Sequence, residues 1–339
     1  FSDYTSSRLY REGAQRGVID PCYPAKVALA HVHNLLVVKH RRKRLDCIFF
    51  PLITKIPCWV ADSSGEDACC TVAATPQTVR AAMTREVDVF EQEGVVYLAP
   101  LLDLTDRALL AGEMFETWEA LLGLTPEENN RAIEQAWAAQ ERFESELRRR
   151  GKEVLEMLER EGRIGILILG RPYHQDPGVH HGLFDRLQEL GYPILTPGSL
   201  PLDPDVLERL FADDLREGVV GDPLEIGDVW VNAYSTNSSQ KIWAAKFAAR
   251  HPLLVAVDVS SFNCGHDAAI ARVCEAVVEA SGRPLFAFRD LDENRPTGTF
   301  QIRLETIDYF LKEFGQGREK GLRKPCLESQ EKLLSSRAG

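Results

Sequence analysis

The chain has 339 residues, of which 44% are hydrophobic, and its formal net charge is −11 at pH 7. This length is enough for two domains that each bury a core. The acidic balance argues against nucleic acid as a partner, and no apolar run is long enough to cross a membrane. We therefore expect a cytoplasmic protein. Its eight cysteines are too sparse for a small disulfide scaffold, which favours reduced thiols or a metal site.

The first 124 residues alternate between helical and strand patterns. The chain opens on polar turn residues, from which we infer that a strand precedes them in a longer product. Residues 47–52 have the apolar run of a buried strand that ends at a proline. Thr75 and Pro76 predict the N-cap and the first turn of a helix that continues through residue 90, and a strand follows at 95–98. This order predicts a first α/β lobe that is incomplete at its N-terminus.

A helical connector and a second lobe are predicted next. Thr125 and Glu128 have the spacing of a capping box, and the amphipathic pattern behind them continues to residue 163 with a break near Gly151. Residues 164–315 alternate between buried strands and helices, which predicts a second doubly wound lobe, and residues 316–339 predict a flexible tail. The strands expected in this lobe are 164–169, 193–196, 253–259 and 285–288, and the helices are 182–190, 204–215, 240–250, 266–280 and 306–314.

Three cysteines are predicted to lie where a loop enters a helix. Cys264 follows the valine-rich strand 253–259, at the edge where doubly wound sheets bind ligands. The amides of a helix start favour a thiolate there and lower its pKa. Cys22 and Cys70 occupy similar positions in the first lobe. If the lobes face each other, three thiolates suit an iron–sulfur cubane or a zinc ion with an open position. Because no C-x-x-C motif is present, buried cysteines without a ligand are the alternative.

A second candidate site is the loop 170–182, which follows a predicted strand and opens a helix. Free amides at a helix start bind anions, and Arg171 can add a bidentate contact to a phosphate or carboxylate. Three histidines of this loop can act as acids or bases, or can ligate a metal: His174, His180 and His181. The alternative is a polar loop that is held by its own hydrogen bonds.

A third loop, residues 228–241, consists largely of small and polar residues and also precedes a helix. It either lines the same cleft or caps its own helix through Asn237 or Ser238. We favour the capping interpretation.

Four stretches together resemble a known family. They are residues 20–26 (DPCYPAK), 31–34 (HVHN), 170–178 (GRPYHQDPG) and 261–267 (SFNCGHD). They are similar to the C-terminal region of large acyl-CoA dehydratase activase-related proteins. That region is similar in turn to the cluster-bearing subunits of 2-hydroxyacyl-CoA dehydratases and to double-cubane iron–sulfur proteins. The resemblance extends to about residue 314.

The resemblance implies an α/β fold with two Rossmann-like lobes, joined by the long helical segment. It also implies an iron–sulfur cluster of the 4Fe-4S type, single or double cubane, in the cleft between them. Cys22 and Cys264 match the motifs of the family directly. Cys70 is the best third ligand, although Thr71 replaces the proline that usually follows this cysteine. Since Cys69 precedes it, the choice between Cys69 and Cys70 stays open.

For function, the resemblance implies the electron-receiving part of a dehydratase system. An ATP-dependent activase domain or subunit would pass a low-potential electron to the cluster, which reduces a small substrate such as an acyl-CoA beside the loop 171–181. The chain has no Walker-type loop, so ATP hydrolysis is assigned to that partner, and a homodimer is a further expected assembly. The rival functions are a docking module without a cluster and a zinc hydrolase that uses the loop histidines.

Overall fold

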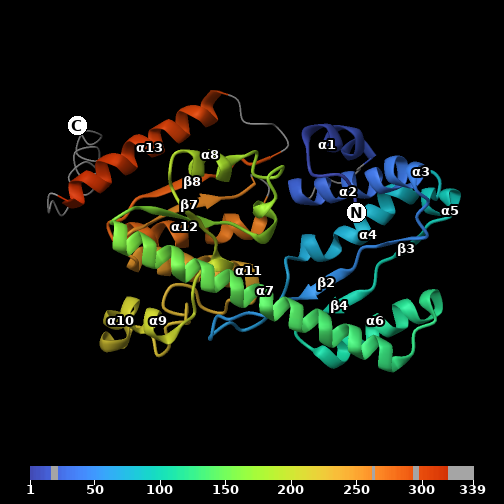
Figure 1. The fold of residues 1–339 in the computed structure, drawn as a ribbon, viewed down its shortest axis with the longest axis horizontal. Helices are drawn as coiled ribbons and strands as arrows, with labels where there is room; N and C mark the ends of the chain where they lie inside the picture. The colour runs from blue at the N-terminus through green and yellow to red at the C-terminus, as the bar shows by residue number, and fades with distance from the viewer. Residues whose placement is uncertain (17–21, 262–263, 293–297, 320–339) are drawn as a thin grey trace.

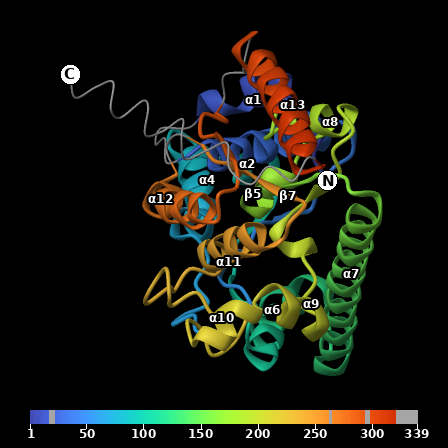
Figure 2. The same cartoon turned by 90° about the vertical axis from the view of Figure 1, so that its left-hand side faces the viewer.

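The computed structural model describes residues 1–16, 22–261, 264–292 and 298–319. Figure 1 shows two α/β halves side by side, and one long helix, α7 (Pro126–Glu161), runs along both. Figure 2, turned by 90°, shows α7 at one side of the molecule. We call the described residues before α7 the first half and those after it the second half. No helix in these described ranges is both long and apolar enough to cross a membrane.

The first half contains two parallel pairs of short strands. Strand β1 (Cys47–Phe49) pairs with β3 (Val96–Leu98), and β2 (Leu52–Lys55) pairs with β4 (Leu101–Asp103). Hydrogen bonding continues across the junctions, because Phe50 N donates to Leu98 O at 2.8 Å. The helices of this half are α1 (Ser7–Gly13), α2 (Tyr23–Asn34), α3 (His40–Arg42), α4 (Cys70–Thr84), α5 (Val89–Glu93) and α6 (Arg107–Leu122), with 3-10 turn η1 (Ala14–Arg16) and π-helical turn η2 (Leu35–Lys39).

Two expectations for the first half are wrong. The N-terminal stretch expected to be turns contains α1, which Ser6 caps by accepting a hydrogen bond from Leu9 N at 3.2 Å. Helix α4 begins five residues before Thr75, holds Pro76 in its interior and ends at Thr84, so it does not continue through residue 90 as expected. Thr75 does not cap the helix, because its hydroxyl donates to Thr71 O at 2.7 Å. Pro76 is buried with the apolar face of α4, so packing overrides the local signal for a helix start.

The second half contains a four-stranded parallel sheet in the order β6 (Ile194–Leu195), β5 (Gly165–Leu169), β7 (Leu254–Val259), β8 (Leu285–Phe288). Every residue of β5 and β7 is buried, as expected of central strands with helices on both faces. The helices of this half are α8 (Leu183–Glu189), α9 (Pro204–Leu210), α10 (Ala212–Glu217), α11 (Thr236–Arg250), α12 (Gly265–Ala280) and α13 (Gly298–Glu319), with 3-10 turns η3 (Pro172–Gln175) and η4 (Pro197–Ser199).

The side chains of β5 show how the two faces are covered. Leu167 and Leu169 pack into a core with α7, α11 and α12, whereas Ile166 and Ile168 pack into a second core with α8 and α13. The α/β class with parallel sheets is therefore confirmed, and the strands of the second half lie where the sequence predicts them. In the first half the four described strands form two two-stranded parallel sheets, so a doubly wound lobe there stays a prediction.

Four helices differ from the sequence expectation, one of them α11, which begins at Thr236 rather than at residue 240. Helix α7 has the predicted capping box at Thr125 but continues through Gly151 without a break. The helix expected at 204–215 is divided at Phe211 into α9 and α10. Helix α13 extends to Glu319 and so includes the first residues of the expected tail; residues 320–339 lie outside the described ranges. The domain boundaries at 124 and 163 stay predictions.

Two loops join the halves and position the site. The loop 56–67 pairs with the segment 224–236, where Asp67 N donates to Tyr234 O at 3.0 Å and Thr236 N donates to Asp67 O at 3.1 Å. On the other side, the loop 171–182 reaches α1 and α2, and Thr5 Oγ1 donates to Asp176 Oδ2 at 2.7 Å. The start of α11 and the loop 171–182 are therefore held by direct contacts with the first half.

Candidate functional site

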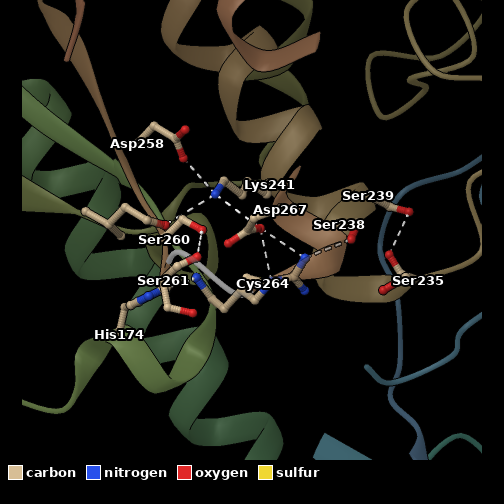
Figure 3. A network of polar contacts seen from close by, with 12 residues as sticks. His174, Ser235, Ser238, Ser239, Lys241, Asp258, Ser260, Ser261, Cys264 and Asp267 are labelled. Carbon is tan, nitrogen blue, oxygen red and sulfur yellow. Dashed lines mark hydrogen bonds and ion pairs between the residues drawn. The ribbon is translucent and has the colours of Figure 1, made fainter. Parts of the chain in front are cut away.

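A buried group of charged and polar side chains lies at the carboxyl ends of β5 and β7 (Figure 3). The carboxyl ends of neighbouring parallel strands meet at one edge of a sheet, which is where ligands bind in such folds. The starts of α11 and α12 lie at the same edge. We call this group the polar cluster; its members, all less than 10% exposed, are Arg171, His174, Ser238, Lys241, Asp258 and Asp267.

Lys241 is the central cation of the polar cluster. Its Nζ lies 2.7 Å from Asp258 Oδ1 and 3.3 Å from Asp267 Oδ1. Burial lowers the pKa of the ammonium, but the two carboxylates outweigh it, so that the pKa of Lys241 is raised overall. Lys241 is therefore charged at neutral pH, and its role in the described structure is to compensate the two aspartates.

Arg171 is the second cation, and its partner is in the first turn of α12. Its Nη2 lies 3.0 Å from Asp267 Oδ1 and donates to Ser238 Oγ at 3.1 Å. Burial raises the pKa of Asp267, but Lys241 and Arg171 outweigh it and bring the pKa to about 2. We expected Arg171 to bind the anion of a ligand. Instead its guanidinium is paired with the carboxylate of Asp267. Its Nη1 is buried without a hydrogen-bond partner among the described residues.

His174 lies beneath this ion network and is almost completely buried. Its Nδ1 accepts a hydrogen bond from Arg171 N at 3.0 Å, so the ring proton resides on Nε2. Burial, reinforced by the charge of Lys241, lowers the pKa of His174 to about 3. The imidazole is therefore neutral at physiological pH, and this argues against the predicted acid–base role.

The other two histidines of the loop lie apart from the polar cluster. The ring of His180 is stacked on Phe184 at 4.1 Å between centroids, and burial lowers the pKa of His180. His181 has a positive φ of 54° and its Nε2 lies 2.6 Å from Asp292 O. The structure therefore brings Arg171 and His174 together, whereas the ring of His180 contacts Phe184 and that of His181 contacts Asp292.

Cys264 is the N-cap of α12, as the sequence predicts, and is 8% exposed. The hydroxyl of Tyr173 lies 4.0 Å from its Sγ. The expected low thiol pKa is wrong for this arrangement. Burial and then the Asp267 carboxylate raise the pKa of Cys264, and together they outweigh Arg171 and the helix amide.

Cys22 approaches the same tyrosine from the first half. It is the N-cap of α2, and the next residue, Tyr23, packs in one small apolar cluster with Tyr173. The pKa of Tyr173 is raised chiefly by burial, then by Cys264 and Asp267, and more weakly by Cys22. Two of the three predicted ligands therefore lie around the Tyr173 ring.

Cys70 does not complete a metal site in this arrangement. It is the exposed first residue of α4, and Cys69 is the half-buried N-cap of that helix. In the part of the chain that the structure describes, no three His, Cys, Asp or Glu side chains lie close enough together to hold a metal ion. Cys22 and Cys264 thus both lie near Tyr173, and the site of three cysteines stays a prediction.

Sequence reasoning did not single out the three residues that dominate the electrostatics of the site. Asp258 and Asp267 are the anions, and Lys241 is the cation between them. A signal for Asp258 was present, since it is the one charged residue in the apolar strand Leu254–Val259. A charge in such a strand requires a buried partner, and Lys241 in α11, the helix before this strand, supplies it.

A pocket of about 350 Å³ opens next to the polar cluster, between the starts of α11 and α12. Its walls include Ser235 and Ser238 of the α11 start, and Gly265 and His266, which follow Cys264. Trp230 supplies an aromatic wall. The expected capping of α11 by Asn237 or Ser238 does not occur: the N-cap is Ser235, and the hydroxyl of Ser238 accepts from Arg171 instead.

A family model described as "CoA enzyme activase uncharacterised domain (DUF2229)" matches residues 1–200, more than half of the 339-residue chain. The chain belongs to this family. The resemblance to activase-related proteins is thereby confirmed at the level of the family. Comparison with curated proteins gives no match, and comparison with solved structures gives none either.

The activase-family match covers only part of the candidate site. It includes Cys22, Cys70 and the loop that carries Arg171 and His174, and it ends before α11, β7 and α12. The polar cluster thus joins side chains of the matched region to partners from residues 201–339. The similarity to dehydratase cluster subunits and to double-cubane proteins stays a prediction.

Proposed function

We propose that this chain is the electron-accepting iron–sulfur component of an activase-dependent system that acts on a small substrate such as an acyl-CoA. An ATP-dependent activase domain or subunit is the expected donor of a low-potential electron. The observation that carries this proposal is the placement of Cys22 and Cys264 at two helix starts, one from each half, around Tyr173. Metal binding would require deprotonation of Cys264, whose pKa is raised by burial and by Asp267.

The cysteines of the candidate site fit an iron–sulfur cluster in part. Cys22 and Cys264 would be the first two ligands, and the cluster would supply one-electron transfer at low potential. The third ligand, Cys70 or Cys69, begins α4 in the first half. Binding of a cluster therefore requires the α4 start to approach Cys22 and Cys264. We also propose that the two halves are Rossmann-like lobes and that the start of α4 approaches Cys22 and Cys264 in the cleft between them.

Within this proposal Arg171 and His174 position Cys264 rather than exchange protons with the substrate. Arg171 holds Asp267 in the first turn of α12, three residues after Cys264. His174 in turn accepts the hydrogen bond of the Arg171 amide. Their contacts fix the helix start from which the Cys264 thiol projects, whereas His180 stacks on Phe184 and His181 contacts Asp292.

The test is the iron and sulfide content of the full chain purified without oxygen. We expect about four irons per chain for a single cubane, or about eight for a double one, with visible absorption that dithionite bleaches. Cys22→Ala and Cys264→Ala should each lose the cluster, and the pair Cys69→Ala and Cys70→Ala identifies the third ligand. Cys47→Ala is the matched control, since Cys47 lies on β1, and it should keep its iron.

Two results would contradict the proposal. One is a folded, colourless chain that takes up no iron on reconstitution; if it still bound its activase, it would be a docking module. The other is full iron in both the Cys22→Ala and the Cys264→Ala variants, which would exclude these thiols as ligands. Bound zinc without visible absorption would instead favour the hydrolase alternative.

A further inference from the structure

The pocket beside the polar cluster is bordered by two helix starts. Helices α11 and α12 pack against each other and are 15 and 16 residues long. Three helix-start residues that line the pocket, Ser238 of α11 and Gly265 and His266 of α12, have amides that donate to no backbone carbonyl of the described residues. Unpaired amides and the helix dipole together favour an anion at such a place.

A buried hydroxyl in the pocket wall is the independent observation that points to a ligand. Ser235 is only 3% exposed and lines the pocket, yet its Oγ has no hydrogen-bond partner within the described ranges. A serine at the N-cap normally accepts a hydrogen bond from its own helix, and Ser235 does not. Because buried polar atoms in native structures are almost always paired, a bound group is expected to complete its hydrogen bonding.

Ser238 supplies the second hydroxyl in the pocket wall, and this hydroxyl can donate a hydrogen bond to a ligand. Ser238 Oγ accepts from Arg171 Nη2 at 3.1 Å, so its own O–H is directed to another acceptor. Arg171 is 2% exposed and places a cation behind this wall, although Asp267 balances most of its charge. The pocket therefore offers many hydrogen-bond donors and little net charge, which suits an oxyanion with several acceptor oxygens.

We propose that this pocket binds the phosphate group of a small organic phosphate, held by the amides at the starts of α11 and α12 and by the hydroxyls of Ser235 and Ser238. Its volume of about 350 Å³ is at the lower end for ligand pockets, so a small phosphate ester fits better than a dinucleotide. Trp230 and Ile270 supply an apolar wall for the carbon part of the ester. The proposal goes beyond the electron-transfer function and does not depend on a cluster.

The test is calorimetric titration of the full chain with inorganic phosphate, compared with acetate and with chloride at the same ionic strength. We expect saturable binding of phosphate alone. Ser235→Ala and Ser238→Ala should each weaken it on the order of tenfold, since each removes one hydrogen bond to a charged ligand. The exposed Ser145 of α7 supplies the matched control, and Ser145→Ala should bind like the wild type.

A third variant removes an amide and keeps the helix. Gly265 is the first residue of α12, and the extended backbone of Cys264 before it (φ −79°, ψ 100°) is compatible with a following proline. Gly265→Pro should fold, by circular dichroism, and bind phosphate on the order of tenfold more weakly. The proposal would be overturned if Gly265→Pro and Ser235→Ala both bound phosphate with wild-type affinity. It would also be overturned if the wild type showed no saturable binding of phosphate, or bound acetate equally well. None of these results depends on iron content, so the cluster proposal is tested separately.

Discussion

At the scale of single residues, burial and charge decide what each side chain of the site can do. Lys241, Asp258 and Asp267 are all buried, and Lys241 Nζ lies within 3.3 Å of a carboxylate oxygen of each aspartate. Such a network is strongly destabilised when one partner is removed, since the remaining charge is left uncompensated. His174 has no carboxylate of its own, and burial therefore keeps its ring neutral.

The neutral state of His174 predicts a pH dependence of stability. The folded-state pKa of about 3 lies below the ordinary value of 6.5, so a proton binds first to the unfolded chain. The contribution of His174 is complete above the ordinary value and is lost as the pH falls toward the folded value. Between pH 6.5 and 5 the loss is about 2 kcal/mol.

The measurement is the free energy of unfolding by urea as a function of pH. His174→Gln cannot be protonated in this range and keeps an acceptor for the Arg171 amide, so its stability should fall less steeply than that of the wild type. Equal slopes for the two proteins would mean that His174 is protonated in the folded state.

At the scale of elements, close packing explains why α7 contains a glycine. A Cβ at Gly151 would lie 1.7 Å from Ser199 O in η4. The helix therefore remains continuous where the sequence suggested a break, and the glycine allows η4 to pack directly on the helix backbone. Leu155 and Leu158 follow on the same helix and enter the core of the second half.

Two glycine-to-alanine changes test this interpretation. Gly151→Ala should lower the free energy of unfolding by about 1–3 kcal/mol, because overpacking against a backbone carbonyl outweighs the gain in helix propensity. Gly112 of α6 is the matched control, since a Cβ there meets no atom of the described chain within 4 Å. Gly112→Ala should raise the free energy by about 0.5–1 kcal/mol. Equal effects of both changes in chemical denaturation would contradict the packing explanation.

At the scale of the whole molecule, the halves are joined by loop hydrogen bonds and by Val60 and Trp59, which pack into the core of the second half. Asp62 of the first half accepts from Ile226 N at 2.9 Å and from Gly227 N at 2.6 Å in the second half. Ser64 N adds a bond to Ala233 O at 2.6 Å. These contacts place the loop 56–67 beside the start of α11, and so beside the pocket that Ser235 lines.

Removing the Asp62 carboxylate should loosen this contact. In Asp62→Ala the amides of Ile226 and Gly227 lose their charged acceptor, at a cost of about 1–3 kcal/mol for the local structure. Hydrogen exchange followed by mass spectrometry should show faster exchange in residues 224–230. Asp88→Ala is the control, because Asp88 caps only α5 within the first half. Unchanged exchange in residues 224–230 would show that Asp62 does not hold the two halves together.

Local patterns in the sequence determined the elements of this protein. The apolar runs of β5 and β7, the capping box of α7 and the position of Cys264 between a strand and a helix depend on neighbouring residues alone, and all are present. Where a local signal competed with packing, as at Pro76 in α4 and Gly151 in α7, it predicted the wrong boundary.

Only the tertiary structure decided which of these elements share a site. It paired Lys241 with Asp258 and Asp267, placed Cys22 and Cys264 around Tyr173, and left Cys70 at a separate helix start. Periodicity specifies which face of an element is buried, but not which distant residue it meets there. That choice depends on how the two halves pack, and the loop contacts that fix it join residues more than a hundred positions apart.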